Sequence, residues 1–305
     1  MMSDTVSVWL SLLLVFVAAP LVPGVATRTK AMLAGRRGAP VWQLYADLWK
    51  LLRRGVVYSD VVTGAFRVAP VAVLATTVIA ATLLPLGGRA SVLRFGGDAI
   101  AFACLLATGR FALILGAFDT GSSFEAMGAS RDATFAALVE PGLFLVFAGL
   151  GVAAGSLTLT SMLGPHAMPL TGAAPASVLF AAAVFALALA ECARVPVDDP
   201  TTHLELTMVH EVMVLDHSGP DLAMILYANA LKLALFSAVL VGVAAPDRGA
   251  SGVAGVLALL GALMVVGIAV GIVESITARL RLPRVPLFIA GGNALALFGL
   301  VLLVR

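Results

Sequence analysis

Long apolar runs alternate with short polar stretches along the whole chain. A run of about 20 residues, rising about 1.5 Å per residue as a helix, is long enough to cross a hydrocarbon core of roughly 30 Å. Lipid offers no partner to open backbone groups, so we expect each run to be a helix. The pattern predicts eight spans, at about 5–27, 67–87, 98–118, 134–157, 174–193, 222–244, 252–275 and 286–304. The expected fold class is an all-α polytopic membrane bundle, with residues 1–305 as a single membrane domain.

Composition supports this prediction. Hydrophobic residues make up 61% of the chain and charged residues 12%, with a mean hydropathy of +1.05, whereas a soluble domain has about 25% charged residues. The chain has two cysteines and neither belongs to a CxxC pair. It therefore cannot by itself ligate an iron-sulfur cluster that needs four cysteines.

The distribution of Lys and Arg predicts the orientation. The first apolar run has no basic residue before it and Arg28 and Lys30 after it, the reverse of a cleavable signal peptide. The connections 28–67, 119–133, 194–221 and 276–285 hold 13 of the 19 Lys and Arg residues. By the positive-inside rule we expect these connections to be cytoplasmic and both termini to lie outside.

The segment "APVWQLYADLWKLLRRG" follows the first span. Its polar residues Gln43, Asp47, Lys50 and Arg54 recur at helical spacing, and apolar residues form the other face. This predicts an amphipathic helix that begins at Pro40 and lies in the membrane interface. A plain surface anchor and a functional element are both compatible with the pattern.

Glycines four residues apart occur in two predicted spans. They are Gly151 with Gly155, and Gly267 with Gly271. Small residues at this spacing let two helices approach closely. We interpret both pairs as packing contacts without a functional role.

Ionisable residues inside the predicted spans are the first candidates for function. A charge in a span costs at least about 2.5–3.5 kcal/mol, and a buried carboxyl can exchange a proton near neutral pH. The candidates for proton or ion coupling are Glu140, Glu191, Lys232 and Glu274, where Lys232 supplies the complementary charge. Arg110 lies in the third span and Asp119 at its end, and there we favour structural ion pairs or groups that extend to the membrane surface. The alternative for every one of these residues is a structural pair or a group that extends to the membrane surface.

The connection between the fifth and sixth spans is rich in ionisable groups. Residues 190–223 contain seven of the 17 acidic residues and three of the four histidines. His203, His210 and His217 recur every seven residues, which would place them on one helical face, but seven residues span about 10 Å along a helix. A zinc site of the HExxH type needs histidines four apart, so we predict no metal site. Such a loop can carry protons toward the bilayer or dock a basic partner surface.

Three ordered motifs resemble one family. "ECARVPVDDPTTHLELTMVHEVMVLDHSGPDLA" resembles the signature loop of the membrane subunit of energy-converting [NiFe] hydrogenases, formate hydrogenlyase included. That family is similar to a core membrane subunit of respiratory complex I, mitochondrial subunit 1, whose loop begins Glu-x-x-Arg-x-Pro-Phe-Asp. Glu191, Arg194, Pro196 and Asp198 match it here, with Val197 in place of Phe. "RRGAPVWQLYADLWKLL" and "GSSFEAMGASRDATFAALVEPGLFL" are similar to two further family segments.

The resemblance implies roles for particular residues. Glu140 and Glu191 match intramembrane carboxylates at the start of a proton path. A second set matches the cytoplasmic loop that faces the redox arm: Arg194, Asp198, Asp199, His203, Glu205, His210, Glu211 and Asp216. A third set matches the segment that lines the quinone cavity in complex I: Arg36, Arg37, Gln43, Asp47 and Lys50. The loop lacks the "PFDL" of complex I, which puts quinone binding in question.

The resemblance also implies a function and partners. The chain is expected to be the membrane-anchor and ion-coupling subunit of a hydrogenase-type complex in a bacterial or archaeal plasma membrane, not catalytic on its own. The [NiFe] centre and iron-sulfur clusters are expected in partners: the hydrogenase large and small subunits and a ferredoxin-like iron-sulfur subunit, with antiporter-like membrane subunits beside them. Alternatives are a quinone-site subunit of a complex I-type NADH-quinone oxidoreductase, a stand-alone secondary transporter and a purely structural anchor. Nothing in the sequence indicates nucleic-acid binding.

Overall fold

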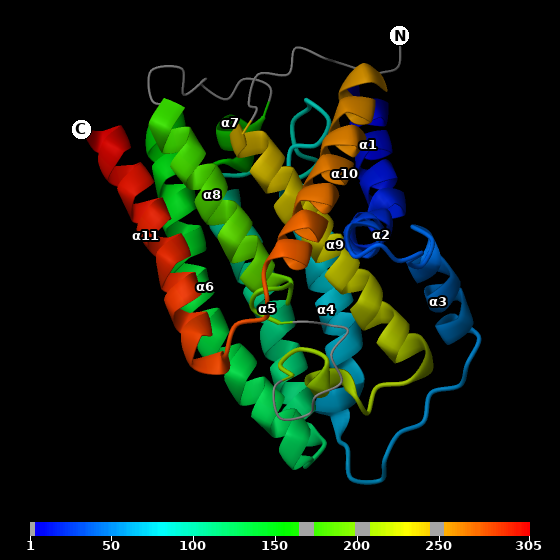
Figure 1. Cartoon of the computed structure of the whole chain (residues 1–305). Coiled ribbons are helices and arrows are strands. Elements are labelled where there is room, and N and C mark those ends of the chain that lie inside the picture. Colours follow the sequence, from blue (N-terminus) through cyan, green and yellow to red (C-terminus); the bar gives the residue numbers. More distant parts are fainter. Residues whose placement is uncertain (1–3, 165–173, 199–207, 245–252) are drawn as a thin grey trace.

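A computed structural model describes residues 4–164, 174–198, 208–244 and 253–305, and this part of the chain contains helices and no strands (Figure 1). The helices are α1 (Asp4–Ala18), α2 (Leu21–Leu33), α3 (Gln43–Leu52), α4 (Gly64–Leu83), α5 (Asp98–Asp119), α6 (Ser123–Ala154), α7 (Leu159–Leu163), α8 (Ala174–Glu191), α9 (Gly219–Ala244), α10 (Val253–Ile276) and α11 (Val285–Val304). Two 3₁₀ turns, η2 (Val212–Val214) and η3 (Leu282–Arg284), precede α9 and α11. The all-α prediction is confirmed.

The number of membrane-crossing helices is close to the predicted eight. Six helices of the described chain, α4, α5, α6, α9, α10 and the η3–α11 segment, are long and apolar enough to cross a membrane alone. The bent pair α1 and α2 makes a seventh if it counts as one span, and α8 is apolar but shorter. Each of the eight predicted ranges therefore corresponds to a helical segment. Six of these meet the length requirement alone, the first meets it only as a bent pair, and α8 is shorter.

The first predicted span is broken between α1 and α2. The two helices meet at an angle of 40°, where Pro20 and Pro23 interrupt the sequence. Proline has no N–H, so the Phe16 carbonyl loses its intrahelical donor at position 20. The Tyr227 hydroxyl donates to that carbonyl instead, at 2.9 Å. The bend is therefore a stable feature with its backbone group satisfied.

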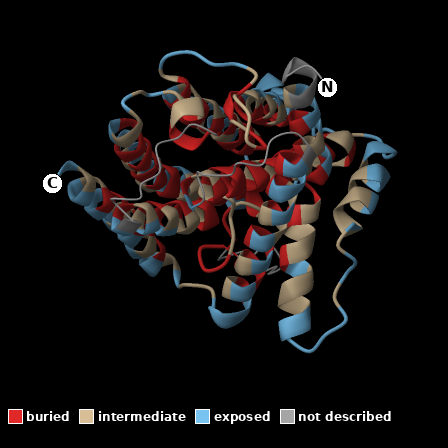
Figure 2. Ribbon diagram, turned by 90° about the horizontal axis from the view of Figure 1, so that it is seen from above, coloured by how far each residue is buried: buried red, intermediate tan, exposed pale blue. Residues whose placement is uncertain are grey.

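Helix α9 lies in the middle of the bundle and α11 at its edge (Figure 1). Seen from above, buried residues fill the middle of the bundle and the C-terminal end lies at its edge (Figure 2). In the most apolar stretch of α9, 67% of the residues are buried, compared with 22% for the α11 segment. Helices α4 and α8 pack on α9, α2 packs on α10, and α6 and α8 both pack on α11. The ring of Phe180 on α8 fills the space beside Gly149 and Gly299, where a Cβ would lie 2.2 and 2.9 Å from it.

Helix α6 begins earlier than predicted. Residues 119–133 were expected to be a cytoplasmic loop, yet α6 begins at Ser123 and continues for 32 residues. One side of its first turns is buried because Gly128 packs against Val209 and Val212, and Arg131 Nη1 donates to the Met208 carbonyl at 3.1 Å. The extension is held by a tertiary contact with the loop before α9, which hydropathy along the sequence cannot reveal.

Two smaller predictions are also revised. Helix α3 begins at Gln43, and Pro40 lies in the preceding turn, where its carbonyl accepts the Gln43 N–H at 3.0 Å. Gly155 is not a packing residue, because it ends α6 with φ of +65° and a Cβ there would meet nothing within 4 Å. Gly271 on α10 does pack closely, since a Cβ there would lie 2.5 Å from the Ala26 carbonyl oxygen on α2.

Candidate functional site

Four helices bring five ionisable residues together inside the bundle. We call Arg110 (α5), Asp132 and Glu140 (α6), Glu191 (α8) and Lys232 (α9) the central group. Arg110 Nη2 forms an ion pair with Glu191 Oε2, and Arg110 Nε lies 3.6 Å from Asp132 Oδ2. Lys232 Nζ lies 3.7 Å from Glu191 Oε1. The side chains of Arg110, Glu191 and Lys232 are only 8%, 6% and 12% exposed, so these charges have little water to stabilise them and depend on one another.

Within the central group, Glu140 is the carboxylate without a fixed cation. Arg110 and Lys232 balance the charges of Glu191 and Asp132, the carboxylates that they contact. No hydrogen bond or ion pair joins Glu140 to any residue in the described ranges, although its charge acts on Arg110. An ionised Glu140 gives the group a net charge of −1, and a protonated Glu140 makes it neutral. Glu140 is therefore the member of the central group whose charge no described cation balances.

Two cavities adjoin the central group. A cavity of about 160 Å³ lies between α5 and α6 and is lined by Glu140, Glu191 and Arg110 together with exposed Cys104 and Phe144. A second cavity of about 20 Å³ is lined by Arg110 and Lys232 together with His210, Asn229 and Thr77. The first has room for several water molecules and the second for about one. Arg110 and Leu106 line both cavities, so the two lie on either side of these α5 residues.

The second cavity reaches the polar loop through His210. Asn229 Nδ2 lies 2.7 Å from His210 Nε2, and Asp198 Oδ2 accepts the backbone N–H of His210 at 3.1 Å. Arg279 Nη2 holds the other oxygen of Asp198 at 2.7 Å. Burial, reinforced by the charge of Lys232, lowers the pKa of His210. The imidazole is therefore neutral at pH 7 and can accept a proton from one side and release one to the other.

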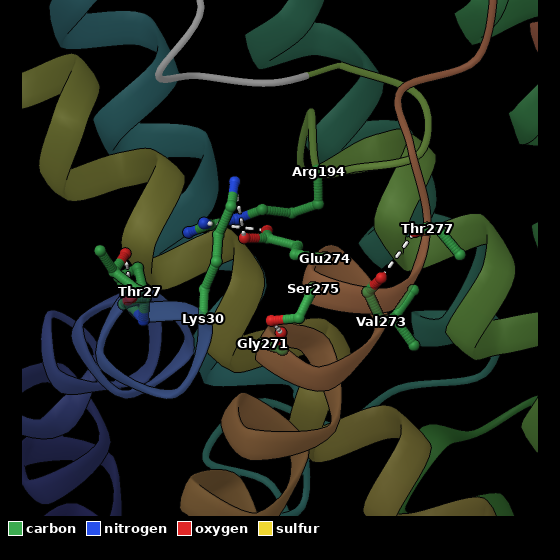
Figure 3. A network of polar contacts seen from close by, with 9 residues as sticks. Thr27, Lys30, Arg194, Gly271, Val273, Glu274, Ser275 and Thr277 are labelled. Carbon is green, nitrogen blue, oxygen red and sulfur yellow. Dashed lines mark hydrogen bonds and ion pairs between the residues drawn. The ribbon is translucent and has the colours of Figure 1, made fainter. Parts of the chain in front are cut away.

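Glu274 does not belong to the central group. It lies near the end of α10 and contacts Arg194 Nη1 at 3.4 Å and Lys30 Nζ at 3.9 Å. Both cationic side chains converge on its carboxylate (Figure 3). This set, which we call the Glu274 group, connects α2, α10 and the segment that follows α8. The sequence predicted Glu274 as a coupling residue alongside Glu140, and the fold separates the two.

A further polar set, absent from the predicted site, lies at the end of the molecule where α9 begins. Glu125 is 1% exposed and accepts the backbone N–H of Asp216 at 3.0 Å. His217 is 3% exposed and stacks on Phe66, with ring centroids 3.9 Å apart and planes 5° apart. Neither ring nitrogen has a hydrogen-bond partner among the described residues. Burial lowers the pKa of His217 to about 4.

The same region holds the segment before α4 in place. The Tyr58 hydroxyl donates to Asp221 Oδ2 at 2.7 Å, and this hydrogen bond raises the pKa of the Tyr58 phenol. Asp119 accepts the Thr63 N–H at 2.7 Å and the Phe66 N–H at 3.0 Å, so it caps α4. Asp119 thus has a structural role as a helix cap, in place of the ion pair that the sequence favoured.

The remaining predicted residues are dispersed. Asp199, His203 and Glu205 lie outside the described residues. His210 and His217 do not share a helical face, because the described part of their loop consists of turns and η2, and their rings lie in different surroundings. Glu211 precedes η2 and is partly buried, and Asp216 follows η2 and is exposed. Arg36, Arg37, Gln43, Asp47 and Lys50 line neither of the two cavities, so their assignment to a quinone-like cavity stays a prediction.

Sequence reasoning left out three residues that complete the site. Arg110 was expected to be structural, Asp132 was assigned to a loop, and Asn229 is uncharged, so none stood out. The usable signal was that Arg110 and Lys232 are the two basic residues within predicted spans. Among the described residues, no group of three or more His, Cys, Asp and Glu side chains could hold a metal ion.

Comparisons with known proteins identify the family of this chain. A model of the NADH dehydrogenase family matches residues 6–304. The chain is 33% identical to formate hydrogenlyase subunit 4 of Escherichia coli (strain K12), over 95% of both chains. It is 32% identical to hydrogenase-4 component C of the same organism, over 74% of this chain and 71% of that protein. A chain of the membrane-bound sulfane sulfur reductase, an archaeal respiratory membrane complex, has the same fold, with a TM-score of 0.80 at 18% identity over 97% of this chain and 99% of that one. The chain therefore belongs to the NADH dehydrogenase family.

Proposed function

We propose that this chain is the membrane-anchor and ion-coupling subunit of a hydrogenase-type membrane complex, in which it links electron transfer in a cytoplasmic redox arm to the movement of protons or Na⁺. Family membership and the two Escherichia coli relatives support the assignment. The redox arm, with its [NiFe] centre and iron-sulfur clusters, would be held by the hydrogenase large and small subunits and a ferredoxin-like subunit. Antiporter-like subunits would continue the membrane part.

The observation that carries the proposal is the surplus carboxylate of the central group. Glu140 lines the larger cavity, has no fixed cation, and shares that cavity with the paired residues Arg110 and Glu191. Arg110 also lines the smaller cavity, which includes Lys232 and His210. Polar groups therefore continue from the loop at Asp198, through His210 and the Arg110 region, to Glu140 in the middle of α6.

The proposed cycle moves one proton along this series. A proton taken up from the loop side reaches His210, whose neutral imidazole accepts it. It then passes through water in the cavities to Glu140, which becomes neutral. Release from Glu140 toward the exposed mouth at Cys104 and Phe144 restores the charge of −1. Arg110 and Lys232 stay in contact with Glu191 throughout, so the ion pairs of the central group are not broken during the cycle.

The proposed orientation places the loop end on the cytoplasmic side. The start of α1 and the end of α11 lie at one end of the bundle, the segment before α4 reaches the other end, and α3 lies at the side between them (Figure 1). This agrees with the charge distribution, because the connections assigned to the cytoplasm carry most of the basic residues.

The decisive experiment is Glu140→Gln in the intact complex, reconstituted into liposomes. We expect electron transfer and assembly to continue while the number of ions moved per electron falls to near zero. Glu274→Gln is the matched control, because it makes the same chemical change at a carboxylate that lines neither cavity. Ion movement at the wild-type ratio in the Glu140→Gln complex would sink the proposal.

The nature of the redox arm is tested by the metals that copurify with the tagged chain after gentle extraction. Nickel and iron together with hydrogen evolution would support the hydrogenase-type arm. Iron and flavin without nickel would instead favour a quinone-reducing arm of the complex I type. Ion uptake by this chain alone in liposomes would contradict both and favour a stand-alone transporter.

A further inference from the structure

Helix α3 presents its aromatic side outward. Trp42 and Trp49, two helical turns apart, are 66% and 58% exposed. The polar residues Gln43 and Asp47 are less exposed and are hydrogen-bonded to each other at 2.9 Å. A helix at a water-exposed surface would show the opposite arrangement. The outer face of α3 therefore suits an apolar environment.

A specific contact fixes this orientation. Tyr45 on α3 donates its hydroxyl to the Val17 carbonyl at the break between α1 and α2. The neighbouring Phe16 carbonyl is satisfied in the same way by Tyr227 from α9. Because Tyr45 points into the bend, the tryptophans cannot turn inward without leaving a backbone carbonyl unsatisfied.

The carboxyl end of α3 is basic. Lys50, Arg53 and Arg54 are exposed and follow Trp49 directly, and the Arg53 guanidinium lies over the Trp49 ring, 4.4 Å from its centroid. Lys50 is 3.9 Å from Asp47 in an exposed pair, and such pairs contribute little. Arg53 and Arg54 form no ion pair within the described chain. Before α3, Arg36 and Arg37 are exposed too, and residues 5–46 contain no Asp or Glu.

We infer that α3 forms a binding site for anionic phospholipids, with the acyl chains against Trp42 and Trp49 and the headgroup phosphate bound by Lys50, Arg53 and Arg54. Guanidinium groups match phosphate oxygens in geometry and charge. Exposed tryptophan next to exposed arginine is the combination found where hydrocarbon meets headgroups. An acidic protein surface would also satisfy the cations, but it would not account for two exposed tryptophans on the same helix.

The position of α3 in the chain favours lipid over a protein partner. The helix lies between α2 and α4, which belong to membrane-crossing segments, and the Tyr45 contact ties it to the bend in the first of them. Its depth is therefore tied to that of the spans. Basic residues near the membrane surface attract anionic lipid, so these three residues give a clear preference for anionic over zwitterionic lipid.

The test uses the intact complex with a photoreactive phenylalanine analogue in place of Trp49. After detergent exchange, the complex is incubated with vesicles of phosphatidylglycerol or of phosphatidylcholine and illuminated, and adducts are identified by mass spectrometry. We expect at least about fivefold more adducts with phosphatidylglycerol. Equal labelling by the two lipids, or adducts to another subunit in the native membrane, would overturn the inference.

Two further measurements test the role of the charges. Lys50→Gln/Arg53→Gln/Arg54→Gln should remove the excess of phosphatidylglycerol adducts, and Arg281→Gln/Arg284→Gln, at an exposed basic turn before α11, should leave it unchanged. In the complex without charge substitutions, raising NaCl from about 0.05 to about 0.5 M should reduce the excess of phosphatidylglycerol adducts severalfold, because salt screens exposed charges. An excess that persists in the triple variant and at high salt contradicts the inference.

Discussion

The central group and the Glu274 group contain the same kind of ion pairing but differ in the neighbouring carboxylates and cavities. In each, a buried carboxylate contacts two cationic side chains. The central group also contains Asp132 and Glu140 and lines both cavities, whereas Glu274 and its partners line neither. Proton movement needs an acceptor without a fixed partner and room for water, and of these two groups the central group has both among the described residues. Two sites that look alike as lists of charged residues are therefore expected to differ in function.

The largest effect is expected from Arg110→Met. This substitution removes the cation that Glu191 and Asp132 share and leaves buried carboxylates with Lys232 alone. Breaking a buried ion pair from one side costs about 3–5 kcal/mol, so the thermal midpoint of the complex should fall steeply. Arg281→Met, at an exposed turn, should change stability by less than about 0.5 kcal/mol. If the two variants unfold at the same temperature, the central group is not what holds α5, α6 and α8 together.

Gly271→Ala tests the packing beneath the Glu274 group. The added Cβ would meet the Ala26 carbonyl oxygen at 2.5 Å, which forces α10 away from α2 and destabilises the protein by about 1–3 kcal/mol. Gly261→Ala on the same helix is the control, because its Cβ would meet nothing within 4 Å. Thermal unfolding of both variants checks the prediction, and equal midpoints would contradict it. The ratio of ions to electrons should not change in either.

Glu274→Gln should have a smaller effect. The side chains of Lys30 and Arg194 are 30% and 13% exposed, so water partly replaces the carboxylate that they lose. We expect a loss of about 1–2 kcal/mol in stability with unchanged ion coupling. Thermal unfolding and liposome assays on one preparation measure both. Loss of coupling here would mean that the Glu274 group lies on the ion route after all.

The smallest effect concerns pH and involves neither group. Burial lowers the pKa of His217 to about 4, while the unfolded chain binds that proton below about pH 6.5. Stability from His217 is therefore complete above pH 6.5 and is lost as pH falls toward 4, with roughly 1 kcal/mol lost by pH 6. His217→Phe keeps the stacking on Phe66 and should flatten this part of the profile, measured as the free energy of unfolding from pH 7.5 to 6. An unchanged slope would assign the pH dependence to other groups.

The sequence by itself determined the helices and the ionisable residues they carry. A bilayer requires apolar segments of a given length whose backbone is satisfied internally, and this requirement is local and visible in hydropathy. Glu140, Glu191 and Lys232 could be selected for the same reason, since a charge in an apolar run is unfavourable wherever the helix packs. The basic residues after the first span likewise predicted which loops share a side.

Only the tertiary structure decided which of these residues meet. Glu274 and Glu191 were equivalent along the sequence, yet α10 pairs with α2 and carries Glu274 to Lys30, while α8 packs on α9 and carries Glu191 to Lys232. Asp132 became a site residue because α6 starts eleven residues earlier than its apolar run, held by Gly128 and Arg131 against the loop before α9. The aromatic face of α3 points outward because a tyrosine satisfies a carbonyl at a distant bend. Each of these outcomes depends on contacts between segments far apart in the chain, and hydropathy and spacing carry no information about such contacts.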